Sequence, residues 1–420
     1  MSSQTTSKTP AAPLDLSKWR HVPMLLIVVG GCLALLGAIV DSKQFGFSYL
    51  LAFMFFLSLC LGGLGMVILH HLFDASWSVP IRRICEHLAF LLPVMAILFI
   101  PIAILAPKMY PWMHMVLEHT EDHSLHSKYP LFTIPGFYLV VVINFCVWTL
   151  LSYKLRYWSL KQDETGSVEC TRKMRKFSAF GVFLFAVTLT LAAIMWMKAL
   201  QHEWFSTMYG VWYFAGSMWL TIYTIYTLTL LLKRQGPLRE VATDKTFYYI
   251  GSLMFAFTVF YAYITFFQYF IIWNANVPEE TFWFVGREAG TWWYIGLIII
   301  FGHFFLPFLT LLRIDVKVSW AWVMVPLGVW AWIMHFTDLT FNIMPVLHPK
   351  GFALSWMDLA CMAFIGGVLS KVFLIYFNSH PPLPQQDPRF AEAMDIYVES
   401  DQQVDAATVR GVTQKSGGRH

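Results

Sequence analysis

Long apolar stretches separated by short polar connections make up most of the chain. Ten of them approach the roughly 20 residues that a helix needs to cross a bilayer. They lie at residues 22–40, 47–69, 84–106, 132–152, 177–198, 207–232, 247–273, 291–312, 319–337 and 353–377. The pattern predicts an all-α polytopic membrane protein with ten transmembrane helices in one domain, residues 21–377.

Two polar tails flank this domain. Residues 1–20 are rich in Ser and Thr, and residues 378–420 begin with several prolines and end in a polar, Gly-rich stretch. Segments of this composition bury little apolar surface and rarely fold on their own. We therefore expect a flexible N-terminal tail and a C-terminal tail that is largely disordered or bound to a partner.

Composition narrows the class of protein further. The chain is 57% hydrophobic and 13% charged, and its mean hydropathy is +0.57, which excludes a soluble multidomain protein. A net charge of +4 gives no basic footprint for nucleic acid. The six cysteines are widely spaced and favour neither a disulfide framework nor an iron–sulfur or zinc site.

The basic residues are unevenly shared between the two predicted sides of the membrane. Eighteen Lys and Arg residues fall in the tail and connections on one side, and six fall in the connections on the other. Connections rich in Lys and Arg remain in the cytoplasm. Both termini, and the turn between the second and third spans, are therefore predicted to be cytoplasmic.

A charged stretch at this turn is the most unusual feature of the sequence. An ionisable side chain near the bilayer centre costs about 2.5–3.5 kcal/mol, so these residues must lie at an interface or be paired. Glu86 and His87 lie one turn deeper than the rest and are predicted to form the cytoplasmic mouth of a proton path. The remaining residues form an interface cluster: His70, His71, Arg82 and Arg83. Its two arginines are expected either to reach lipid headgroups or to form pairs at the interface.

Polar side chains recur at helical spacing in two consecutive spans. The first stripe is Tyr209, Tyr213, Ser217, Thr221 and Thr224, and the second is Thr258, Tyr261, Thr265 and Gln268. Two such stripes could line a hydrated path in which hydroxyl groups relay protons. Alternatively, the Ser and Thr hydroxyls bond to their own helix and the tyrosines fill a packed core.

Three ionisable residues lie within the later spans. His303 is the deepest, and His335 and Asp338 lie near the outer end of the ninth span. A b-type haem needs two facing histidines, which only His87 with His303 could approximate. A single such pair is weak support, and a lone His is more often a structural or proton-relay residue. No metal or haem ligand is therefore assigned within the spans.

The outer connection at residues 107–130 is rich in histidine. It contains His114, His119, His123 and His126 among three acidic residues. This composition invites a metal site, but the spacing lacks the fixed helical pattern that such a site needs. A solvated or partner-facing loop is the preferred interpretation.

Several short strings together resemble one family. They are His70-His71 followed by Arg82-Arg83 and Glu86, Tyr110-Pro111-Trp112, the stretch 204–210, the run 268–273 with 278–281, and Asp338-Leu339-Thr340 with Pro345. In order and spacing they resemble the F subunits of bacterial alternative complex III, a quinol:electron-acceptor oxidoreductase, within the polysulfide-reductase (NrfD-type) family of membrane subunits. The similarity covers residues 20–377.

The resemblance implies a subunit of the bacterial inner membrane with two four-helix bundles, made of spans two to five and six to nine, plus flanking helices. It implies no cofactor in this chain. Haem c, iron–sulfur clusters and quinol would belong to partners: a sister NrfD-type quinol-binding membrane subunit, a periplasmic iron–sulfur subunit, multihaem cytochrome c subunits and a candidate terminal oxidase. This subunit would supply a proton path, with Glu86 and His87 inside, Asp338 outside, and His303 and the hydroxyl stripes between them.

Two other functions are compatible with the sequence. The chain could be a structural scaffold of the same complex, or a secondary transporter. A transporter is disfavoured because the prolines that interrupt its spans are not accompanied by paired charges. No glycine loop for nucleotides, nucleophile elbow or HExxH motif occurs, so a self-contained enzyme is not expected.

Overall fold

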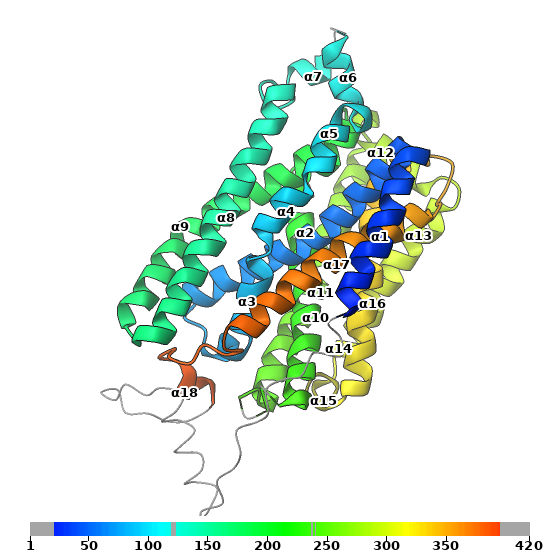
Figure 1. The fold of residues 1–420 in the computed structure, drawn as a ribbon. Helices are drawn as coiled ribbons and strands as arrows, with labels where there is room; N and C mark the ends of the chain where they lie inside the picture. Colours follow the sequence, from blue (N-terminus) through cyan, green and yellow to red (C-terminus); the bar gives the residue numbers. More distant parts are fainter. Residues whose placement is uncertain (1–20, 119–122, 237, 240, 395–420) are drawn as a thin grey trace, which may run out of the picture.

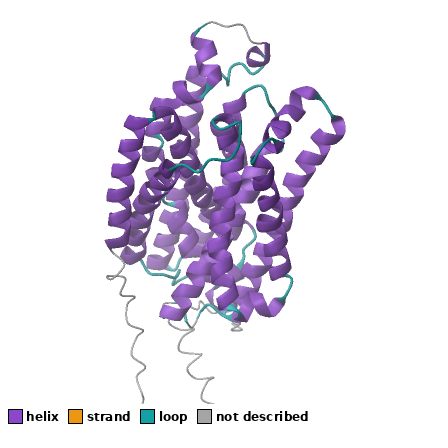
Figure 2. Cartoon of the chain, turned by 90° about the vertical axis from the view of Figure 1, so that its right-hand side faces the viewer, coloured by secondary structure: helices purple, strands orange, loops and turns teal. Residues whose placement is uncertain are grey.

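The computed structural model describes residues 21–118, 123–236, 238–239 and 241–394, and these residues form helices and connecting loops without any strand (Figure 2). The longer helices are α1 (His21–Val40), α2 (Ser42–Leu72), α3 (Val79–Ala89), α8 (Ile134–Thr165), α9 (Val168–Ala192), α10 (Tyr209–Gln235), α11 (Asp244–Ala275), α12 (Pro278–Glu288), α16 (Ala321–Ile343) and α17 (Trp356–Ser379). Shorter helices connect them: α4 (Leu92–Leu98), α5 (Ile100–Met109), α6 (Pro111–Leu117), α7 (His123–His126), α13 (Trp292–Ile298), α14 (Leu306–Leu311), α15 (Ile314–Ser319) and α18 (Phe390–Ala393). Single turns lie at η2 (Ser76–Ser78), η3 (Ala193–Met197), η4 (Lys198–Gln201), η5 (Ile299–Phe305) and η6 (Met344–Val346).

The described residues support the predicted all-α, multi-pass membrane fold, whereas the count of ten spans is not confirmed. Within the described ranges, eight helices are long and apolar enough to cross a membrane. A ninth span is added if the segments 76–98 and 100–109, which meet at 54°, are counted as one broken helix. Pro101 lies beside this break and cannot continue the hydrogen bonding of the preceding turn.

The predicted span at 319–337 corresponds to α16, which does not qualify by composition. The helix has 23 residues, enough to cross a bilayer, but its second half contains several buried polar side chains: His335, Asp338, Thr340 and Asn342. Buried polar groups of this kind face protein and not lipid. The total of ten spans therefore remains a prediction.

Helix α2 lies at the centre of the molecule, where its most apolar 18-residue window is entirely buried. A helix that is apolar on every side needs neighbours on every side, and α2 contacts α3, α9, α10 and α17. Gly62 and Gly63 allow the closest approaches. A Cβ at Gly62 would overlap Thr221 of α10, and one at Gly63 would lie 2.8 Å from Leu88 of α3.

Helices α1 and α17 pack side by side on the outside of this arrangement (Figure 1). The contact depends on two glycines. A Cβ at Gly30 would lie 2.6 Å from the backbone nitrogen of Phe364, and one at Gly367 would lie 2.9 Å from the nitrogen of Ile27. Small residues allow helix backbones to approach closely where lipid provides no hydrophobic drive for association.

The connections predicted to share a side of the membrane also lie together in space. Figure 1 shows α6, α7 and α12 at one end of the long helices and α15 and α18 at the other. The ionisable residues singled out above fall into two groups along this axis, one around α3 and one between α10, α11 and α16.

We predict that replacing Gly30 with Ala weakens the docking of α1 on α17. The new methyl group would press on the backbone of Phe364, which cannot rotate away. Overpacking of this kind costs about 1–3 kcal/mol, so thermal unfolding in detergent should occur at a lower temperature. The matched control is Gly286→Ala in α12, where a Cβ would meet nothing within 4 Å. An equal melting temperature for the two variants would contradict the proposed packing.

Candidate functional site

Two buried groups of polar residues are candidates for function. The first surrounds α3 and contains Arg82, Arg83, Glu86, Asp163 and Asp387. It is called here the inner charge cluster because it lies at the end of the helices that is predicted to face the cytoplasm. The second, called the central triad, consists of His303, His335 and Asp338. Both groups contact α2, through His70 in the first case and Ser58 in the second.

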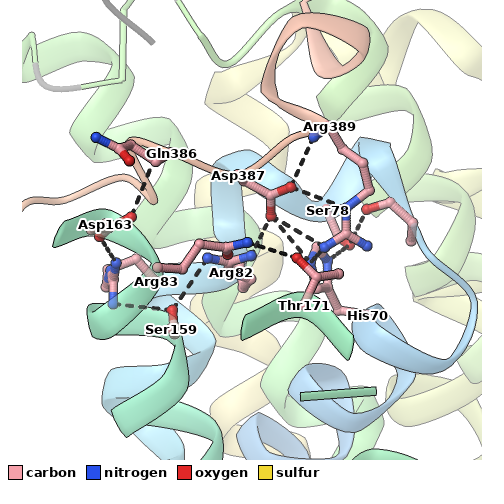
Figure 3. Close-up of polar contacts among 12 residues, drawn as sticks. His70, Ser78, Arg82, Arg83, Ser159, Asp163, Thr171, Gln386, Asp387 and Arg389 are labelled. Carbon is pink, nitrogen blue, oxygen red and sulfur yellow. Dashed lines mark hydrogen bonds and ion pairs between the residues drawn. The ribbon is translucent and has the colours of Figure 1, made fainter. Parts of the chain in front are cut away.

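The two arginines of α3 are completely enclosed by protein. Arg82 and Arg83 are 1% and 0% exposed, so they do not reach lipid headgroups. They form ion pairs instead, which is the second of the two predicted arrangements. Glu86 pairs with both: Arg83 Nη1 donates to Oε2 over 2.8 Å, and Arg82 Nε lies 3.2 Å from Oε1 as an ion pair without a hydrogen bond. Arg83 also pairs with Asp163 at the end of α8, and Arg82 with Asp387 (Figure 3).

The segment 380–394, called here the C-terminal clasp, completes the inner charge cluster. Asp387 is fully buried and pairs with Arg82 and with Arg389, whose Nε lies 3.0 Å from Oδ1. Arg389 Nη1 also donates to Asp74 over 2.7 Å, which joins the clasp to the turn after α2. Part of the predicted C-terminal tail is therefore folded against the helices, and residues 395–420 lie outside the described chain.

A second contact anchors the start of the clasp to α8. The Asp163 carboxylate accepts the backbone N–H of Gln385 over 2.9 Å, and Gln386 lies beside it (Figure 3). Asp163 thus receives hydrogen bonds from the clasp on one oxygen and pairs with Arg83 through the other. The clasp is held to α3 and α8 by buried charges, and not by apolar contacts alone.

The charge of Asp387 is set by its neighbours. Burial alone raises the pKa of a carboxyl group, but Arg82, His70 and Arg389 together hold the pKa of Asp387 well below its usual range. A carboxyl group with a depressed pKa stabilises the fold at every pH above its unfolded pKa of about 3.9, and this contribution is lost as the pH falls through the folded pKa. Asp387 therefore remains ionised throughout the neutral range.

Glu86 and His87 do not form a pair, although they are adjacent in sequence. His87 is fully buried, and its Nδ1 accepts a hydrogen bond of 2.8 Å from Arg156 Nη1 of α8. The Arg156 guanidinium also lies over the rings of Phe90 and Tyr376, at 4.7 and 5.2 Å from their centroids. Since Nδ1 accepts, the proton of neutral His87 lies on Nε2, which is buried and has no partner.

The remaining histidines of the interface cluster differ in their contacts. His70 Nδ1 lies 2.6 Å from Ser78 Oγ, and its Nε2 lies 3.8 Å from Asp387. His71 packs against the His70 ring with centroids 4.8 Å apart, and both of its ring nitrogens lack partners. All four predicted residues of this cluster are buried, and three of them bind the clasp or α8.

The central triad brings together three residues that are distant from the inner charge cluster in sequence. The metal-binding atoms of His303, His335 and Asp338 lie within 4.8 Å of one another, and the three residues are 0%, 1% and 3% exposed. Within the described part of the chain, no other three His, Cys, Asp or Glu side chains meet in this way. The sequence pattern singled out each residue but did not place them together.

Local sequence explains how His303 faces α16. Pro307 has no N–H to bond to the carbonyl of His303, and residues 299–305 form a π-helical turn immediately before it. Gly302 lets α16 approach: a Cβ there would lie 2.5 Å from Met334 Sδ, and Trp330 donates to the Gly302 carbonyl over 2.8 Å. This approach places His335 and Asp338 opposite His303.

Arg287 fixes the outer end of α16. Although α12 lies in a predicted outer connection, Arg287 is only 2% exposed and donates to the carbonyls of Phe341 and Asn342, which end the helix. Its guanidinium lies 3.4 Å from the centroid of the Trp283 ring. Burial lowers the pKa of Arg287 to about 9.

The polar atoms of the central triad are mostly unpaired. His303 is stacked between Trp219 and Tyr261, with centroids 3.8 and 3.9 Å apart, and both of its nitrogens lack a hydrogen-bond partner. His335 Nε2 lies 2.9 Å from Ser58 Oγ, whereas its Nδ1 is unpaired. Asp338 interacts with the Tyr261 hydroxyl, but its Oδ2 is unpaired.

The two hydroxyl stripes have different environments. In α10, most of the hydroxyls donate to backbone carbonyls, as in the core-packing alternative: Tyr213 to Met54, Ser217 to Tyr213, Thr221 to Leu59 and Thr224 to Leu220. Tyr209 lies 3.4 Å from Asn342 Oδ1.

In α11, Thr258 receives a hydrogen bond from Trp219, and Tyr261 faces the triad. Thr265 Oγ1 and Gln268 Oε1 are buried without partners, so this second stripe leads to the triad.

The other two metal or haem interpretations receive no geometric support. His114 forms an exposed contact of 3.2 Å with Glu118, His119 lies outside the described residues, and among the residues that are described, His123 and His126 belong to no cluster of potential ligands. His87 packs against Phe373, Phe377 and His380, whereas the neighbours of His303 are Trp219 and Tyr261. The two histidines have no neighbouring ring in common.

Several residues of these sites were missed by sequence reasoning. The residues are Ser58, Arg156, Asp163, Trp219, Arg287, Asp387 and Arg389. Ser58 and Trp219 look like ordinary members of apolar helices, and Asp387 and Arg389 lie in a segment with a tail-like composition. The one available signal was the excess of buried positive charge on α3, which required acidic partners from elsewhere in the chain.

We predict that Asp387→Ala releases the C-terminal clasp. The substitution leaves Arg82 and Arg389 without their shared carboxylate, and breaking a buried ion pair costs about 3–5 kcal/mol. Trypsin should then cut after Arg389 much faster than in the unmodified protein, which can be followed by mass spectrometry. The matched control is Asp315→Ala, because its pair with Arg313 is exposed. Equal cleavage rates in the two variants would show that the clasp does not depend on this carboxylate.

No known protein family matches the chain, and no curated protein is similar to it.

Proposed function

We propose that the chain is a membrane subunit without its own redox cofactor that gives protons a path through a respiratory quinol oxidoreductase. The observation that carries this proposal is the central triad, in which three ionisable residues are buried between membrane-spanning helices with four unpaired polar atoms. Burying such groups away from water is costly, and in membrane proteins they mark ion and proton pathways.

The second hydroxyl stripe would form the outer half of this path. From the outer end of α11, Gln268, Thr265 and Tyr261 lead to Asp338, and the first two carry buried atoms without partners. Unpaired polar atoms in an otherwise packed interior are the places where ordered water binds. Water between these side chains would connect Asp338 to the outer surface.

On the inner side, His87 is a better candidate than Glu86 for contact with water on the path. Both oxygens of Glu86 face guanidinium groups, so its negative charge is already stabilised. The Nε2–H of His87 has no protein partner and is free to donate to such a water. The α10 stripe between the two halves donates mainly to backbone carbonyls, so a continuous path would require these hydroxyls to rearrange.

The resemblance to F subunits of alternative complex III supplies the wider setting of this proposal. The chain would lie in the bacterial inner membrane with both termini cytoplasmic, beside an NrfD-type quinol-binding subunit, an iron–sulfur subunit and multihaem cytochromes. Spans two to five and six to nine would form two four-helix bundles with α1 and α17 at the flank. In support, α2 contacts α3 and α9, α10 contacts α11 and α16, and α1 contacts α17.

A structural scaffold within the same complex is the second candidate. It is favoured by the hydroxyl groups of α10, which satisfy backbone carbonyls and leave no polar surface open. The two candidates differ in whether the triad is needed for proton movement. They agree on location and partners.

We predict that Asp338→Asn in the assembled complex lowers the number of protons moved per electron while quinol oxidation continues. The amide keeps the shape of the carboxylate but cannot accept a proton. Proton uptake into inverted vesicles, measured with a pH-sensitive dye against electron flow, tests this. Asp315→Asn, an exposed substitution in α15, is the control. An unchanged ratio in Asp338→Asn would favour the scaffold.

A further inference from the structure

We propose that His303, His335 and Asp338 bind a single Zn²⁺ ion. The inference concerns binding only, and it holds whether or not protons pass through the triad. It rests on four features: the arrangement of hydrogen bonds at His335, the unpaired atoms of the other two residues, the choice of ligand atoms, and the space around them.

The hydrogen bonds of Ser58 determine the tautomer of His335. Ser58 Oγ donates its only hydrogen to the carbonyl of Phe55 over 2.6 Å, so it can only accept from His335 Nε2, at 2.9 Å. The proton of the neutral imidazole therefore lies on Nε2. Nδ1 carries a free lone pair, is buried and has no partner. A ring held by its N–H with the opposite nitrogen free is the usual arrangement of a metal-binding His.

His303 is held in a similar way by aromatic rings instead of hydrogen bonds. Trp219 and Tyr261 stack on its two faces at interplanar angles of 21° and 24°, which fixes the plane of the imidazole. A metal ion binds along the nitrogen lone pair, in the plane of the ring, so stacking on both faces does not block it. Both nitrogens of His303 lie at the open edge without partners.

Asp338 completes the set of ligands and supplies the only formal charge. Its Oδ2 is unpaired. Unpaired buried polar atoms are rare, and the presence of four in one triad calls for a missing partner such as water or an ion. Because the potential ligand atoms lie within 4.8 Å of one another, one ion can contact a nitrogen of each His and the carboxylate after small side-chain adjustments.

The ligand types favour zinc over other common ions. Two imidazoles and one carboxylate suit a borderline transition metal, whereas Ca²⁺ and Mg²⁺ prefer sets of oxygen ligands. Three protein ligands leave the fourth tetrahedral position for water. With one carboxylate, the bound Zn²⁺ would retain a single net positive charge, beside the electron-rich faces of Trp219 and Tyr261.

A glycine and two polar side chains lie beside the triad. Gly216 of α10 faces the free side of His335, where a Cβ would lie 3.5 Å from Nδ1 and 3.2 Å from Cε1. The partly buried side chains of Thr265 and Gln268 lead toward the triad from the outer end of α11. An ion could therefore enter along the second hydroxyl stripe, and Gly216 keeps the coordinating edge of His335 free.

The test uses the full-length protein purified in detergent and stripped of metal by chelation. Titration with ZnCl₂, followed by calorimetry and by metal analysis after desalting, should give one tightly bound ion per chain. Co²⁺ should bind at the same site and produce the visible absorption of a tetrahedral centre. Zinc should also raise the melting temperature, since it binds the folded state only.

Variants separate the triad from adventitious sites. His303→Phe keeps the aromatic stack and removes a ligand, and Asp338→Asn removes the charge, so each should weaken zinc binding by at least about 100-fold. Ser58→Ala removes the hydrogen bond that orients the His335 ring and should weaken zinc binding about 10- to 100-fold. Gly216→Ala tests the open edge without removing any ligand and should also weaken binding. The matched control is His114→Ala combined with His126→Ala, which should leave the affinity unchanged.

Several results would overturn the inference that the triad binds zinc. If the stripped protein binds no zinc, or if the tight site persists in both His303→Phe and Asp338→Asn, the triad is not a metal site. Loss of the tight site in the His114 and His126 control would place the ion in the outer connection instead. Because Ser58→Ala and Gly216→Ala retain all three ligands, weakened binding in these variants supports the site even if a ligand variant fails to fold.

Discussion

The complete burial of α2 is the constraint on which the rest of the structure depends. Its apolar window has no exposed face, so every surrounding helix must pack on it closely, and Gly62 and Gly63 let α10 and α3 do so. Most polar side chains that α2 carries therefore find partners inside the protein, with His71 as an exception. Ser58 binds His335 in the interior, and His70 lies against the clasp at the inner end.

The two polar sites satisfy this constraint in different ways. Around α3, carboxylates pair with Arg82, Arg83 and Arg389, and Arg156 donates to His87, although both nitrogens of His71 and the Nε2 of His87 are unpaired. In the central triad, all three members keep an unpaired atom and no cation faces the carboxylate of Asp338 among the described residues. The ion pairs hold α3, α8 and the clasp together, whereas unpaired ligand atoms that converge on one point leave a place for water or an ion. The main functional proposals therefore rest on the triad.

The sequence predicts the class of fold well because hydrophobic length is a property of each segment by itself. The pattern identified the helices and singled out His303, His335 and Asp338 individually. It could not show that a π-helical turn and Gly302 bring them together, because these depend on contacts between η5 and α16. The sequence did not predict the folded clasp for the same reason. Its composition is that of a tail, and its partners, such as Arg82, 305 positions before Asp387, lie far away in the sequence.

The 305 positions between Arg82 and Asp387 affect how the protein folds during its synthesis. The ribosome completes α3 long before it reaches Asp387, and at about 5–20 residues per second the interval is roughly 15–60 s. During this time Arg82 lacks one of its carboxylate partners and remains hydrated or bound to headgroups at the membrane surface. The ion pair between Arg82 and Asp387 can therefore form only after the membrane-spanning part of the chain has been synthesised, so a docked clasp is found only on chains in which that part is complete.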